Sequence, residues 1–129
     1  MFFKMPWFTR GMLERMADFL NPFEQVGGVI GINTLANGLR LDPNGDPYIT
    51  PYGGLAGVGG AAIRDLALGQ CMMWRNCLNP DKAVIGVGGI QLPKHVTDFL
   101  QYCDAVKVHT IYKEKRSRVF RELAGDVAA

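Results

Sequence analysis

Two clusters of glycine occur where a chain could bring bare backbone against an anion. The first spans residues 53–60, and the second, residues 86–89, follows a short apolar run. Glycine allows a sharp turn, and it also lets a ligand approach backbone N–H groups, which bind phosphate when a helix begins behind them. For one such loop taken alone, a tight turn and a phosphate site are equally good interpretations.

Polar side chains also follow short apolar runs that read as strands. Asn33 and Thr34 come directly after residues 28–32, and both can donate and accept hydrogen bonds, as a planar polar substrate requires. A simple strand exit would carry the same residues, so both interpretations stay open. Lys4 ends a short apolar stretch at residues 2–4, where its ammonium could stabilise negative charge on an electron-accepting ring.

The apolar pattern predicts the elements that would position these residues. Helical spacing predicts helices at about 9–20, 61–78, 93–100 and 112–123. Apolar runs without polar alternation predict strands buried on both faces at 28–32, 83–86 and 104–108. Turn residues at 42–47 predict a β-hairpin within residues 39–52. The alternation of buried strands with helices predicts right-handed βα units around a parallel sheet.

The predicted fold is therefore α/β, and its few strands indicate half of a (β/α)8 TIM barrel with the hairpin as an excursion after the Asn33–Thr34 strand. In this barrel the working residues lie at the carboxyl ends of strands, and the loops after the last two strands often hold phosphate. Here those loops are residues 86–89 and His109–Thr110. Two loops at the right positions favour phosphate binding over a tight turn.

Composition excludes several other classes of protein. The chain has 129 residues, which predicts one domain, and its net charge of +2 comes without a basic stripe suited to nucleic acid. The three cysteines lack metal-ligand spacing, so we expect free thiols in a reducing, cytoplasmic compartment and no metal site. No apolar run reaches the length of a membrane span, so no membrane association is expected.

Three motifs in this order and spacing resemble the C-terminal half of dihydroorotate dehydrogenase, most closely its soluble class 1A type. They are INTLANGLRLD at residues 32–42, GGLAGVGGAAIRDLAL at 53–68 and VIGVGGI at 84–90. The resemblance runs from Lys4 to about Leu123 and so covers nearly the whole chain. It implies that residues 1–129 form part of an FMN-binding TIM-barrel domain.

The resemblance implies an oxidoreductase of pyrimidine (UMP) biosynthesis that oxidises dihydroorotate to orotate with FMN and passes the electrons to fumarate. Matched motif by motif, Lys4, Ile32 and Gly60 would contact the flavin, and Asn33 and Thr34 would bind the substrate. The positions that would hold the FMN phosphate are Gly88, Gly89, His109 and Thr110. The full-length enzyme would be a cytoplasmic homodimer.

Two departures from the family pattern concern the site directly. The family has glycine before threonine where this chain has His109 before Thr110, and the imidazole would either add a cation beside the phosphate or collide with it. The family's catalytic base is a cysteine on a mobile loop of the N-terminal barrel half, and none of Cys71, Cys77 and Cys103 matches its position. We therefore assign no catalytic residue within the chain and expect the chain alone to be inactive.

Two alternative functions stay open at this stage. Another FMN- or phosphate-binding barrel would carry the same kind of glycine loop, because such loops recur in this fold. Asn33 and Thr34, followed by Asn37 and Gly38, argue against that alternative. The other alternative is a non-catalytic half-barrel that serves in binding or assembly, since an open half-barrel would expose two strand edges and apolar surface.

Overall fold

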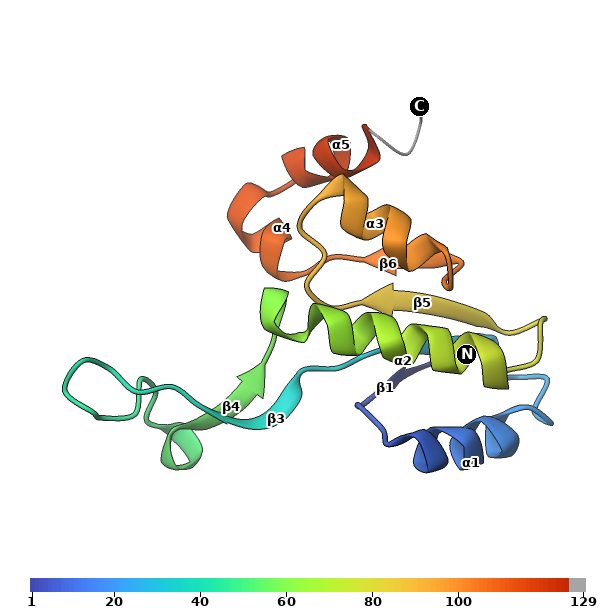
Figure 1. Cartoon of the computed structure of the whole chain (residues 1–129), viewed down its shortest axis with the longest axis horizontal. Coiled ribbons are helices and arrows are strands. Elements are labelled where there is room, and N and C mark those ends of the chain that lie inside the picture. The colour runs from blue at the N-terminus through green and yellow to red at the C-terminus, as the bar shows by residue number, and fades with distance from the viewer. Residues whose placement is uncertain (126–129) are drawn as a thin grey trace.

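The computed structural model describes residues 1–125, which form a parallel sheet with helices packed against it (Figure 1). Its four strands are β1 (Phe2–Met5), β2 (Gly28–Gly31), β5 (Ala83–Val87) and β6 (Ala105–Lys107). They lie in the order β1-β2-β5-β6, which is also their order along the chain. The predicted α/β fold with a parallel sheet is confirmed. Residues 126–129 of the predicted domain lie outside the described part.

Helices connect the neighbouring strands. Helix α1 (Arg10–Leu20) lies between β1 and β2, α2 (Arg64–Cys77) precedes β5, and α3 (Pro93–Leu100) lies between β5 and β6. The buried residues of α1 recur at helical spacing, at Leu13, Ala17 and Leu20, as expected of a helix that packs one face on a sheet. None of the helices within residues 1–125 is long and apolar enough to cross a lipid bilayer.

The core lies between the sheet and these helices. Val29 of β2 and Val84 of β5 are paired neighbours, and both are fully buried. Gly86 of β5 makes room for α3, because a Cβ there would come within 2.5 Å of Phe99 Cδ1 and 2.9 Å of Cys103 Sγ. The first glycine of the 86–89 cluster therefore serves packing rather than ligand binding.

Between β2 and α2 the chain leaves the sheet as an antiparallel pair, β3 (Leu35–Leu39) with β4 (Leu55–Val58) (Figure 1). The connection between them includes a bridge from Leu41 to Pro47 and the 3-10 helix η1 (Pro51–Gly54). A hairpin was predicted within residues 39–52, but the paired strands extend from Leu35 to Val58. The predicted turn residues lie at the tip of this longer excursion.

The C-terminal part differs from its prediction. Instead of one helix at 112–123, the chain forms α4 (Thr110–Lys115) and α5 (Arg118–Ala124). Arg116 separates them with φ 55°, outside the helical region that an uninterrupted helix requires. The two helices follow β6 directly, so Thr110 stands at the carboxyl end of the sheet.

Candidate functional site

A cavity of about 300 Å³ opens at the carboxyl edge of the sheet, where residues after β2, β5 and β6 meet the end of β1. This volume lies at the lower end of the range of about 300–1,000 Å³ typical of small-molecule sites. Nine of the lining residues are those that the sequence analysis singled out: Lys4, Ile32, Asn33, Thr34, Gly60, Gly88, Gly89, His109 and Thr110. The fold thus brings all nine to one place.

Backbone hydrogen bonds fix the strand ends that form this edge. The N–H of Asn33 donates to the Met5 carbonyl at 2.7 Å, and the N–H of Ile32 donates to the Val87 carbonyl at 3.0 Å. These bonds extend the parallel pairing of β2 beyond its last residue on both sides. Ile32 is buried at 2% exposure, whereas the Asn33 and Thr34 side chains are exposed. The cavity therefore combines an apolar wall with accessible amide and hydroxyl groups.

The loop after β5 offers backbone donors to the cavity. Gly88 has φ +136° and Gly89 has φ +68°, conformations that side chains of L-residues rarely adopt. Among the hydrogen bonds formed within residues 1–125, none uses the N–H of Gly88 or Gly89. Consecutive unused N–H groups in such a turn are the donors that a phosphate requires.

The two glycine clusters form one continuous wall. A Cβ on Gly89 would come 2.7 Å from Arg64 Cβ and 2.8 Å from the Gly60 carbonyl oxygen, so the loop after β5 packs directly on the segment before α2. Gly60 itself has φ +70° and lies beside Thr110. The glycines therefore serve both as turns and as a surface on which backbone is accessible.

The hairpin contributes to the site through Thr34. Gly57 of β4 lies against this side chain so closely that a Cβ on Gly57 would overlap Thr34 Oγ1. Gly59 is also close, since a Cβ there would come within 3.4 Å of Thr34 Cγ2. The excursion thus returns to the sheet and packs β4 over the threonine that follows β2.

The charge of the lining favours an anionic ligand. Lys4, Lys107 and His109 carry the ionisable side chains of the described lining, which contains no acidic residue. His109 lies next to Thr110 with its side chain exposed. Residues 1–125 bring no three His, Cys, Asp or Glu side chains together in positions to hold a metal ion. A phosphate-bearing organic ligand suits this surface better than a cation.

Two lining residues with polar or charged side chains, Lys107 and Gln91, were not among the predicted site residues. Lys107 is the last residue of β6, and a search for charged residues at strand ends would have found it. Gln91 follows the glycine loop by two residues, and its sequence context carries no comparable signal. His95, which contacts Gln91 from behind the loop, became apparent only in the folded structure.

The comparisons with known proteins all give the same family. The family model described as dihydroorotate dehydrogenase matches residues 5–125. The chain is 34% identical over 125 residues to the probable dihydroorotate dehydrogenase A (fumarate) of Enterococcus faecalis. It is 31% identical to the dihydroorotate dehydrogenase A (fumarate) of Lactococcus lactis subsp. cremoris, and 29% identical over 121 residues to the dihydroorotate dehydrogenase (fumarate) of Saccharomyces cerevisiae.

These alignments cover most of this chain but a smaller part of each relative. They span 95% of the chain for the E. faecalis protein and 92% for the other two. The chain spans 40% of the length of the two bacterial proteins and 38% of the yeast protein.

Proposed function

Since the chain belongs to the dihydroorotate dehydrogenase family, we propose that it is part of a flavoenzyme that oxidises dihydroorotate to orotate in pyrimidine biosynthesis. Fumarate is the proposed electron acceptor, because the named relatives carry it in their descriptions. The observation that carries the proposal is the cavity at the sheet edge, which unites an amide–hydroxyl pair with a glycine loop that has unused N–H donors. The three free thiols within residues 1–125 support a cytoplasmic location.

The residues of the cavity fit FMN by their donor set and by their lack of acidic side chains. FMN, when bound, would accept the hydride, which carries both electrons of this oxidation. The N–H groups of Gly88 and Gly89 and the hydroxyl of Thr110 would bind its phosphate. Gly60 would present bare backbone to the ring system, and the Lys4 ammonium would stabilise negative charge on that ring.

Asn33 and Thr34 would hold the pyrimidine. Its ring edge carries both carbonyl oxygens and N–H groups, which an amide and a hydroxyl can pair with in turn. The hydrogen bond from Asn33 N–H to Met5 and the packing of Gly57 on Thr34 hold these side chains at the cavity. Ile32 would form the apolar surface beside the flavin. A site that hydrogen-bonds its substrate in this way rejects analogues that lack the matching groups.

We also infer that the sheet is one half of a (β/α)8 barrel. The strand order follows the chain order, as in that barrel, and the site lies at the carboxyl ends of the strands. Beside β6 lies an apolar groove of about 540 Å³, and β1 exposes Phe2 and Phe3, where further strands would pack. The remaining half would supply the catalytic base, and the full-length protein would be a homodimer.

The test of cofactor binding compares FMN with riboflavin, which lacks the phosphate. We expect the 129-residue chain to quench FMN fluorescence saturably and to bind riboflavin at least about tenfold more weakly, because charge-assisted hydrogen bonds to phosphate would be lost. Thr110→Val should weaken FMN binding and leave riboflavin binding unchanged. Equal affinity for the two flavins, or binding of neither, would overturn the proposed phosphate site.

Substrate binding is tested with orotate on the FMN-loaded chain. We expect Asn33→Ala to lower the affinity for orotate by about tenfold or more, the effect of losing a hydrogen bond to a buried polar ligand group. Asn76→Ala is the matched control, since Asn76 is exposed on α2 and does not line the cavity. The assignment fails if both variants bind orotate as the unmodified chain does.

A further inference from the structure

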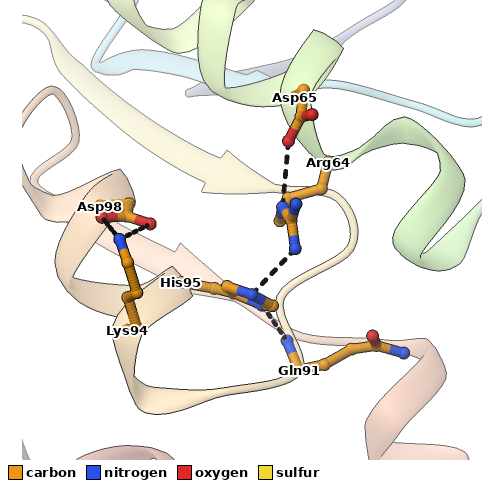
Figure 2. A network of polar contacts seen from close by, with 6 residues as sticks. All are labelled: Arg64, Asp65, Gln91, Lys94, His95 and Asp98. Carbon is orange, nitrogen blue, oxygen red and sulfur yellow. Dashed lines mark hydrogen bonds and ion pairs between the residues drawn. The ribbon is translucent and has the colours of Figure 1, made fainter.

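The His95 side chain lies against the loop that follows β5, and it contacts one residue of that loop and one residue of α2. The residue belongs to the first turn of α3, and it is 8% exposed. Its Nδ1 lies 3.2 Å from the backbone nitrogen of Gln91, and its Nε2 lies 2.9 Å from Nη1 of Arg64 (Figure 2). Gln91 lies in the loop between β5 and α3, two residues after Gly89, and Arg64 begins α2 directly after the segment that contains Gly60.

Both neighbours of the ring are hydrogen-bond donors. A backbone N–H and a guanidinium can only donate, so each contact is a hydrogen bond only when the facing ring nitrogen has a free lone pair. Neutral imidazole has one such nitrogen and accepts from Gln91 or from Arg64, according to its tautomer. The imidazolium accepts from neither, and it places a positive charge 2.9 Å from the guanidinium.

The charged groups around the ring favour its neutral form. Burial, followed by the charge of Arg64, lowers the pKa of His95 below its usual value. The nearby carboxylates have other partners, since Asp65 accepts from Arg64 Nε at 3.1 Å and Asp98 accepts from Lys94 Nζ at 2.8 and 2.9 Å (Figure 2). At neutral pH the ring is therefore uncharged and able to accept.

We propose that neutral His95 is a positioning residue for the phosphate loop: its Nδ1 accepts from the Gln91 N–H, and its ring lies against Arg64 at the start of α2. The imidazole does not line the cavity, whereas Gln91 does, so His95 acts on a ligand only through the loop. Protonation of His95 would release Gln91 and weaken the alignment of the Gly88 and Gly89 N–H groups. The inference rests on the proposed phosphate site and adds a pH dependence to it.

The first measurement needs no ligand. In the free 129-residue chain, we expect the Gln91 amide resonance to titrate together with the His95 ring, with a midpoint below about 6.5, the usual value for histidine. Its hydrogen exchange, corrected for intrinsic rate, should be at least about tenfold faster at pH 5 than at pH 7. In His95→Asn, whose Oδ1 stands near the position of Nδ1 and does not titrate, the Gln91 resonance should not follow this midpoint.

The second measurement is the affinity for FMN between pH 5 and pH 7. The phosphate of FMN itself gains a proton in this range, with a pKa near 6, and this lowers affinity in every variant. The His95→Asn variant measures the loss of affinity that protonation of the phosphate alone causes. We expect the unmodified chain to lose about tenfold more affinity than His95→Asn. His95→Leu, which has no acceptor, should bind FMN weakly at both pH values.

The outcomes separate the two proposals. A Gln91 resonance that ignores the His95 titration overturns the positioning role. An equal loss of FMN affinity in the unmodified chain and in His95→Asn also overturns it, while the proposed cofactor stands. If the Gln91 resonance follows the His95 titration but the chain binds no FMN at pH 7, the proposed phosphate site is refuted. The contact between His95 and the loop is then still established.

Discussion

Gln70 satisfies both backbone polar groups of Phe8. Its Oε1 accepts the Phe8 N–H at 3.1 Å, and its Nε2 donates to the Phe8 carbonyl at 2.8 Å. Gln70 lies on α2 at 1% exposure, and Phe8 lies between β1 and α1 with its ring edge-on to Trp74. One side chain thus connects the segment after β1 to α2. Strand β1 carries Lys4, and α2 follows the first glycine cluster.

Replacing Gln70 should destabilise the chain substantially. Gln70→Leu leaves a buried N–H and a buried carbonyl unpaired, and we expect the free energy of unfolding to fall by about 2–4 kcal/mol. Urea denaturation measures the change. Gln101→Leu, at an exposed position, should stay within about 0.5 kcal/mol of the unmodified chain. Similar losses in the two variants would show that the contact with Phe8 contributes nothing.

Alanine substitutions at Gly89 and Gly45 distinguish the cost of backbone strain from the cost of steric overlap. Both have positive φ, +68° and +89°, but a Cβ on Gly45 has no atom within 4 Å among the described residues. Gly45→Ala should therefore cost only the conformational strain, about 1 kcal/mol. Gly89→Ala adds overlap with Arg64 and Gly60, so its urea midpoint should fall clearly further. Equal midpoints would contradict the close approach of the two glycine clusters.

Lys82 is buried at 2% exposure and donates from Nζ to the carbonyls of Phe23 at 2.9 Å and Val26 at 3.0 Å. Lys82→Met keeps most of the volume and leaves two acceptors without this donor, so we expect a loss of about 2–4 kcal/mol in unfolding free energy. Lys94→Met is the matched control, because Lys94 is exposed and its pair with Asp98 is worth about 0.5 kcal/mol. If Lys82→Met is as stable as Lys94→Met, the prediction is wrong.

The three cysteines should react with iodoacetamide at very different rates. Cys71 is fully buried, and its contact with Cys103 together with burial raises the pKa of its thiol, so little thiolate is exposed to the reagent. Cys77 is only half-buried and should be modified first in the native chain at pH 8. Mass spectrometry of tryptic peptides measures the order, and urea should abolish it. Modification of Cys71 in the native chain as fast as Cys77 would contradict the described core.

Stability should fall on acidification through His95. Its pKa is lower in the folded chain, chiefly because of burial, so the unfolded chain takes up the proton first as the pH falls. The contribution is fully present above about pH 6.5 and is lost as the pH falls through the lower, folded-state pKa. His95→Asn should lose less stability between pH 7 and pH 5, measured by urea midpoints. Parallel pH profiles for the two chains would rule out this contribution.

The sequence predicted which residues line one cavity better than it predicted the bounds of the elements around them. Asn33, Gly88 and Thr110 were found because the carboxyl ends of parallel strands meet at one edge, so that short apolar runs suffice to locate them. The extent of the pairing of β3 with β4 was not predicted, because it depends on contacts distant in sequence, such as Thr34 with Gly57. Strong turn residues at 42–47 mark a tip, and they do not specify how far back the strands pair.

Other features carry no local signal at all. The interruption at Arg116 lacks the glycine or proline that usually marks a helix end. The Gly31–Ile32 peptide bond is cis, although neither residue is proline. The contacts of His95 join the loop after β5 to the first residue of α2, and a single histidine at the start of a predicted helix gave no reason to expect them.

The strand order β1-β2-β5-β6 also bears on how the chain folds during synthesis. Each strand of the sheet pairs with the strand of this sheet that precedes it in the chain, so no strand has to be inserted between two that are already paired. Folding can therefore proceed vectorially, with each βα unit adding to the growing edge as it leaves the ribosome. The loops that would bind phosphate follow β5 and β6, so the cavity is completed last, on a scaffold that is already in place.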